Sequence, residues 1–101
     1  MKYAVPTDDG TTVGKTFGRA VSFAIFDQAD SSMVIVENAG ISAEHGAGTG
    51  AAAFLSDKGV DILIAPEVGP KAAQALAAAG IKIAATSSGT PLRTAIDANR
   101  T

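Results

Sequence analysis

The single histidine of this 101-residue chain, His45, stands in the glycine-rich run Glu44-His45-Gly46-Ala47-Gly48-Thr49-Gly50, and the chain contains no cysteine. Imidazole is a common metal ligand, and glycines let a backbone approach a ligand closely. His45 is therefore the candidate metal ligand, with Gly46 and Gly48 beside it as candidate cofactor-binding residues. One histidine without partners does not complete a metal site, so the alternative is an exposed loop histidine without a function.

A second candidate is Phe17-Gly18-Arg19, which leads into a predicted internal strand. A guanidinium at this position could bind an anionic ligand as a bidentate fork. The alternatives are that Arg19 pairs with a nearby aspartate and that Phe17 is a core residue under the loop. Val68-Gly69-Pro70-Lys71 begins a predicted helix, so Gly69 belongs either to an anion-binding helix N-terminus or to an ordinary helix start.

Composition and short motifs exclude several classes of function. The net charge of −2 argues against a nucleic-acid partner, because binding phosphates requires a basic face. No apolar run reaches the ~20 residues of a membrane helix, and Pro6 interrupts the N-terminus too early for a secretory signal, so we expect a cytoplasmic protein. Gly14-Lys15-Thr16 lacks the glycine of a phosphate-binding loop, because position 9 is an aspartate.

Hydrophobic patterns predict an α/β fold in one domain, residues 1–101, in the order β-β-β-α-β-α-β-α. The predicted strands are residues 3–6, 20–26, 33–37, 61–65 and 81–85, and the predicted helices are residues 51–58, 71–79 and 91–98. Residues 7–18 are expected to form a loop with a small hairpin around residues 11–13, and residues 38–50 a long loop. Gly59 and Gly80 are predicted to end the first two helices.

The predicted order places several loops together. Three antiparallel strands followed by two helical crossovers make the first, third, fourth and fifth strands parallel, with helices on both faces of a mixed five-stranded sheet. The loops that follow these four strands then emerge at one end of the sheet, where open α/β sheets bind ligands. We call this end the rim; it is expected to hold residues 7–19, the His45 loop and the segments 66–69 and 86–89.

The segments Phe17-Gly18-Arg19-Ala20, Glu37-Asn38, His45-Gly46-Ala47-Gly48 and Val68-Gly69-Pro70-Lys71, in this order and spacing, resemble the dinitrogenase iron–molybdenum cofactor biosynthesis family. The resemblance covers nearly the whole chain. It implies a ribonuclease H-like fold without nuclease activity and a role in carrying or assembling the metal–sulfur cofactor of nitrogenase. It also implies that His45 lies near the cofactor and that Phe17-Gly18-Arg19 is the rim motif.

The chain departs from the family pattern in two places. Thr16 stands where many relatives have a histidine, and Pro66-Glu67 stands where relatives tend to have two glycines. Two hypotheses follow. The first is a non-catalytic carrier of an anionic metal–sulfur cluster, with cofactor-assembly proteins as partners. The second is a regulatory or interaction module that binds a small anion or a protein partner without metal.

We predict that the purified protein hydrolyses neither nucleotides nor nucleic acids. Ribonuclease H-type nucleases hold two metals on clustered carboxylates, whereas residues 2–6 contain no acid and Asp61 opens the fourth strand at the wrong end. Assays with ATP, RNA and DNA in the presence of Mg²⁺ or Mn²⁺ test this expectation. Metal-dependent turnover that is lost in Asp8→Asn or Asp61→Asn would contradict it.

Overall fold

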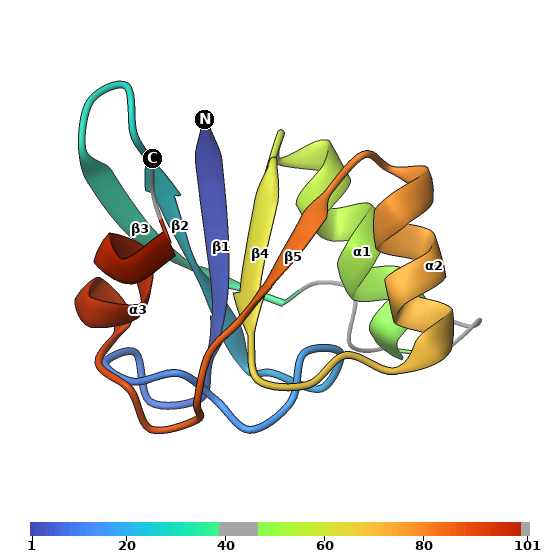
Figure 1. Cartoon of the computed structure of the whole chain (residues 1–101), viewed down its shortest axis with the longest axis horizontal. Helices are drawn as coiled ribbons and strands as arrows, with labels where there is room; N and C mark the ends of the chain where they lie inside the picture. The colour runs from blue at the N-terminus through green and yellow to red at the C-terminus, as the bar shows by residue number, and fades with distance from the viewer. Residues whose placement is uncertain (39–46, 100–101) are drawn as a thin grey trace.

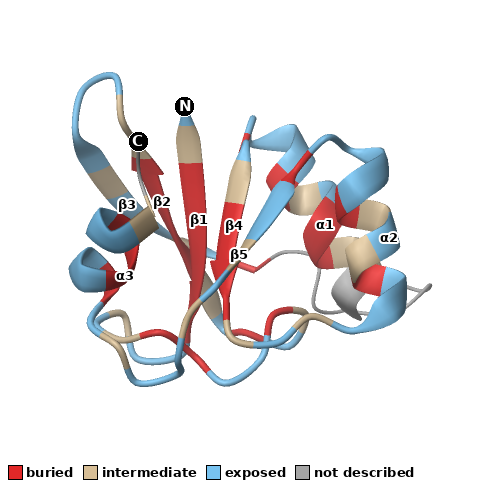
Figure 2. Cartoon of the chain, in the orientation of Figure 1, coloured by how far each residue is buried: buried red, intermediate tan, exposed pale blue. Residues whose placement is uncertain are grey.

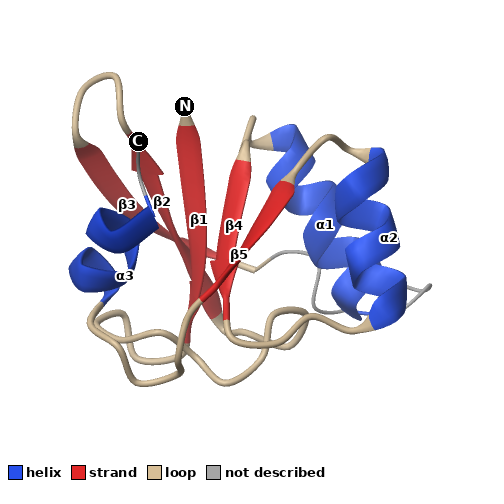
Figure 3. Cartoon of the chain, viewed as in Figure 1, coloured by secondary structure: helices blue, strands red, loops and turns tan. Residues whose placement is uncertain are grey.

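A computed structural model describes residues 1–38 and 47–99 and shows the expected ribonuclease H-like α/β architecture, a mixed five-stranded sheet with helices (Figures 1 and 3). The elements are β1 (Lys2–Thr7), β2 (Ser22–Asp27), β3 (Ser32–Glu37), α1 (Ala47–Asp57), β4 (Ile62–Ala65), α2 (Pro70–Ala78), β5 (Lys82–Ala85) and α3 (Leu92–Asn99). The predicted order of strands and helices is therefore confirmed.

The strands lie in the order β3-β2-β1-β4-β5. β1 pairs antiparallel with β2 and parallel with β4, β2 pairs antiparallel with β3, and β4 pairs parallel with β5. Strands β1, β3, β4 and β5 therefore point the same way, as predicted. Their carboxyl ends define the rim, which lies at the bottom of the view in Figure 1.

Helices cover both faces of the sheet, and each face has its own apolar core (Figures 1 and 2). On one face α1 and α2 pack through residues such as Leu55 and Leu76 against Leu63 of β4. On the other face α3 packs through Ile96 against strand residues that include Ile64. Residues Leu63 and Ile64 are neighbours in β4, so the alternation of side chains along one strand supplies both cores.

The two edges of the sheet are less well covered than its centre. β1 and β2 are almost entirely buried, whereas β3 and β5 are mostly exposed, as the pale blue and tan segments of Figure 2 show. Ile35 of β3 and Ile83 of β5 keep 45% and 43% of their surface exposed. The apolar runs of the internal strands are thus explained by burial on both faces.

Gly59 and Gly80 follow α1 and α2 with φ angles of +75° and +77°, so both predicted helix stops are confirmed. α1 begins earlier than the predicted residue 51, because the helix starts at Ala47 and includes Gly48 and Gly50. Glycine lowers helix propensity by about 1 kcal/mol, which favours a loop when the sequence is considered alone. Packing of the following turns on the sheet outweighs that local preference.

Within residues 1–38 and 47–99, no helix has the length and apolar character needed to cross a membrane.

The structure predicts different costs for two isoleucines on neighbouring strands. Ile64→Ala should lower the free energy of unfolding by ~2–5 kcal/mol, because it opens a cavity in the core under α3. Ile83→Ala, the matched control, should cost less than ~1.5 kcal/mol, since much of that side chain is already in water. Urea denaturation of both variants measures the difference. A loss for Ile64→Ala no larger than the loss for Ile83→Ala would mean that the sheet face under α3 is not a packed core.

Candidate functional site

The described loops at the rim are those after β1, β4 and β5, and the helices α1, α2 and α3 all begin there (Figure 1). This arrangement follows from the parallel strands, because each crossover must return the chain to the opposite end of the sheet. The predicted meeting of residues 7–19 with segments 66–69 and 86–89 at one end is therefore confirmed for the described residues.

The loop after β1 is fastened to the loop after β5 by backbone hydrogen bonds. Val13 N–H donates to Thr90 O at 2.8 Å, Gly89 N–H donates to Val13 O at 2.8 Å, and Leu92 N–H donates to Thr11 O at 3.0 Å. The hairpin predicted around residues 11–13 is thus wrong, since this segment pairs with a partner more than 75 residues away rather than with itself. Local sequence carries no signal for such a contact.

Asp9 organises the first turn of this loop. Its carboxylate accepts hydrogen bonds from Thr12 N–H at 2.8 Å, Thr11 N–H at 2.9 Å and Thr12 Oγ1 at 2.8 Å. These bonds, the one from the Thr12 backbone first, hold the pKa of Asp9 well below its ordinary range although the side chain is exposed. The negative charge of Asp9 is therefore stabilised by hydrogen-bond donors of its own loop.

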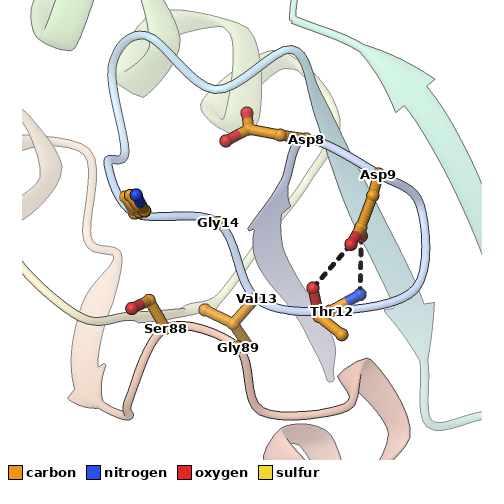
Figure 4. A pocket seen from close by; sticks show the side chains of 8 residues that line it. Asp8, Asp9, Thr12, Val13, Gly14, Ser88 and Gly89 are labelled. Carbon is orange, nitrogen blue, oxygen red and sulfur yellow. Dashed lines mark hydrogen bonds between the residues drawn. The ribbon is translucent and has the colours of Figure 1, made fainter.

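Asp8 and Gly14 border a pocket of about 270 Å³ between the two loops (Figure 4). Asp8 Oδ1 accepts a hydrogen bond from Val21 N–H at 3.1 Å. A Cβ at position 14 would lie 3.3 Å from Asp8 Oδ2, so a side chain there would have to displace the Asp8 carboxylate slightly. Figure 4 shows Asp8 across the pocket from Ser88, while Asp9 turns toward Thr12.

Phe17 is buried, with its ring 5.6 Å from that of Phe23, in the core that α1 and α2 share. It forms the core plug that one of the two sequence-based interpretations expected. The turn from Phe17 to Ala20, closed by Ala20 N–H donating to Phe17 O at 3.3 Å, therefore lies on the face of the sheet where α1 and α2 begin. Phe17 thus fixes the place of Gly18 and Arg19 at the rim.

Arg19 is exposed at the end of this turn. Among the described residues it makes no ion pair, so the predicted alternative of a structural pair with Asp8, Asp9 or Asp27 is not what the structure shows. Lys15, on the preceding part of the loop, is also exposed and without an ionic partner within residues 1–38 and 47–99. Two cations thus remain available to a ligand on this loop.

No role for Asn38 follows from the sequence patterns. This residue is buried at the end of β3, and its side-chain amide donates to Gly18 O and to Ala20 O, both at 3.0 Å. The signal that the sequence offers is the position of Asn38, a polar residue shortly after the apolar run of a strand. Its partners lie about 20 residues earlier, so they become visible only in the folded chain.

The N-termini of α1 and α2 carry no negative charge of their own. Neither helix has an acidic residue in its first turn. Gly69 is the N-cap of α2 and gives no side-chain hydrogen bond, and Gly48 lies in the first turn of α1. Free N–H groups at such helix starts favour bound anions.

His45 and Gly46 lie outside the described residues, so their predicted roles remain predictions. Within residues 1–38 and 47–99 there is no group of three or more histidine, cysteine or acidic side chains that could hold a metal ion. Asp61 lies at the end of the sheet opposite the rim, where its carboxylate accepts a hydrogen bond from Lys2 N–H at 2.8 Å.

Comparisons with known proteins agree with this arrangement. The sequence profile of a family described as dinitrogenase iron-molybdenum cofactor matches residues 1–100. The apo form of the orange protein from Desulfovibrio gigas superposes with a TM-score of 0.87 at 38% identity, over 95% of this chain and 83% of that one. A NifB-type protein from Thermotoga, assigned to the DUF35 family, superposes with a TM-score of 0.79 at 37% identity, over 96% of this chain and 84% of that one.

An uncharacterised protein of Methanocaldococcus jannaschii is 31% identical over 86 residues, which is 82% of this chain and 72% of that protein. The similarity therefore extends over most of the chain in each comparison.

Asp9 predicts a pH dependence of stability. Because its pKa is depressed in the folded protein, the stability it adds is fully present above the ordinary value of 3.8 and is lost as the pH falls through the lower folded value. The difference in unfolding free energy between wild type and Asp9→Asn should thus be constant above about pH 5 and shrink toward pH 2. Urea denaturation at several pH values measures it, with Asp57→Asn as the control.

A difference that stays unchanged down to pH 2 would show that the carboxylate of Asp9 does not need its charge to hold the loop.

Proposed function

The chain belongs to the dinitrogenase iron-molybdenum cofactor family, and on this premise we propose that it binds and carries an anionic metal–sulfur cofactor at the rim without catalysing a reaction. The description of the family names the iron-molybdenum cofactor of dinitrogenase, and the similar orange protein is described in its apo form. The proposal assigns the cofactor to the face of the rim where α1 and α2 begin, beside the Phe17–Ala20 turn.

The observation that carries the proposal is the convergence of positive groups on this part of the rim. Two helix N-termini without acidic first turns lie there, together with the exposed guanidinium of Arg19. Helix N-termini and an arginine each favour a bound anion, and the arginine adds charge-assisted hydrogen bonds. An anionic cluster matches that set of groups better than a bare metal cation does.

The carboxylates of the same loop do not oppose an anion as strongly as their number suggests. Asp9 is surrounded by N–H and hydroxyl donors of its own turn, and Asp8 accepts the Val21 N–H. Each negative charge is thus partly compensated inside the loop. Glu67 is the exposed acid that remains near the start of α2.

The donor set also determines how the cargo is held. The chain has no thiolate, so no cysteine sulfur can replace a ligand on the metal ions of a cluster. A cluster bound here keeps its own sulfide ligands and is held by N–H groups, cations and, as the sequence predicts, the imidazole of His45. Such a cluster arrives preassembled and is released intact, which suits a carrier.

The proposal predicts that tetrathiomolybdate binds to the wild-type protein and more weakly to two variants. His45→Ala should cause the largest loss, because no other imidazole or thiolate can replace the lost ligand. Arg19→Ala should weaken binding about tenfold, since it removes a charged hydrogen bond worth at least ~1.5 kcal/mol. Absorption titrations of the thiomolybdate bands measure both affinities.

Arg93→Ala is the matched control, because it removes the same charge from α3, where the guanidinium lies 5.4 Å from the Phe26 ring on the other face of the sheet. It should leave binding unchanged. Molybdate serves as a second probe with the same charge and no sulfur. Equal binding of both anions, or equal binding by wild type and His45→Ala, would favour an anion-binding interaction module over a metal–sulfur carrier.

A further inference from the structure

Asn38 connects the end of β3 to the turn that carries Arg19. It is 4% exposed, and three hydrogen bonds join it to the segment between Gly18 and Val21. Its side-chain NH₂ donates to Gly18 O and Ala20 O at 3.0 Å each, and its backbone N–H donates to Val21 O at 3.1 Å. One buried residue thus holds the carbonyl groups on both sides of Arg19.

These bonds determine the direction of the Arg19 backbone. The peptide between Gly18 and Arg19 is planar and trans, so the Arg19 N–H points opposite to the Gly18 carbonyl and hence away from Asn38. No described residue accepts a hydrogen bond from this N–H. The N–H is therefore directed away from a buried residue, and the Arg19 side chain itself is exposed.

The amide of asparagine suits the chemistry of this link. The asparagine NH₂ has two donor hydrogens, enough for two carbonyls at once. Aspartate offers no donor when ionised, and a serine hydroxyl offers a single one. Apolar residues leave both carbonyls without this partner. Position 38 is thus matched to two acceptors placed two residues apart.

We propose that Asn38 is a positioning residue for anion binding: by fixing the Gly18 and Ala20 carbonyls inward, it presents the Arg19 N–H and guanidinium together to the ligand. This inference rests on the proposed function and adds a backbone donor to the binding site. The residue that sets the site therefore lies outside it and does not contact the ligand.

A double-mutant cycle with tetrathiomolybdate tests the role of Asn38. Asn38→Ala should weaken binding about as much as Arg19→Ala, roughly tenfold, and adding Arg19→Ala to it should cause less than about a threefold further loss. A residue that merely stabilises the fold would give additive losses instead. Asn38→Leu, which restores most of the volume that alanine leaves empty, should behave like Asn38→Ala and guards against a folding defect.

Asn99→Ala is the control, because Asn99 also donates a side-chain hydrogen bond to a carbonyl, Ala95 O at 2.8 Å, but on α3. It should leave the affinity unchanged. In the free protein, ¹⁵N relaxation should show increased mobility of the Gly18, Arg19 and Ala20 amides in Asn38→Ala and not in Asn99→Ala.

The outcomes separate the two proposals. If the wild type does not bind tetrathiomolybdate, both the carrier function and the role of Asn38 fail. If the wild type binds but Asn38→Ala binds equally well, or its loss adds fully to that of Arg19→Ala, the role of Asn38 fails and the carrier function stands. Unchanged mobility of the turn in Asn38→Ala also overturns the role of Asn38.

Discussion

Strand β1 is the constraint on which the rest of the structure depends. It is paired along both edges, antiparallel with β2 and parallel with β4, and residues Tyr3–Thr7 are buried. Because β4 and β5 continue parallel to β1, each connection between them must cross back through a helix. That requirement places the starts of α1 and α2 at the end where β1 stops, and α3 begins at the same end because it follows β5.

The electrostatic character of the rim differs from that of the whole chain. The net charge is −2, yet Lys15 and Arg19 project from the loop after β1 without an ionic partner in the described part of the chain. Asp8 and Asp9 of the same loop are held by backbone N–H groups. Hydrogen bonding inside the loop thus engages the two carboxylates, whereas the two cations have no ionic partner among the described residues, and the proposed binding of an anion by a mildly acidic chain depends on this difference.

Two buried polar side chains at strand ends, Thr7 and Asn38, hold the adjoining loops in place by hydrogen bonds. Thr7 Oγ1 donates to Thr12 O at 2.7 Å and accepts from Gly10 N–H at 2.9 Å, so the end of β1 shapes the Asp9 turn. Asn38 does the same from the end of β3 for the turn at Arg19. Within the described residues no buried side-chain polar atom lacks a partner, as expected where loop geometry depends on buried hydrogen bonds.

The sequence by itself determined the type and order of the elements, the helix stops at Gly59 and Gly80, and the end of the sheet at which the loops meet. These features depend on hydrophobic periodicity and on local backbone preferences, both of which can be recognised in short segments of the sequence. Only the tertiary structure decided that α1 begins at Ala47, that Val13 pairs with the segment after β5, and that Asn38 holds the Arg19 turn. The physical reason is that packing and hydrogen bonds between residues distant in sequence outweigh local preference, and no local pattern records such partners.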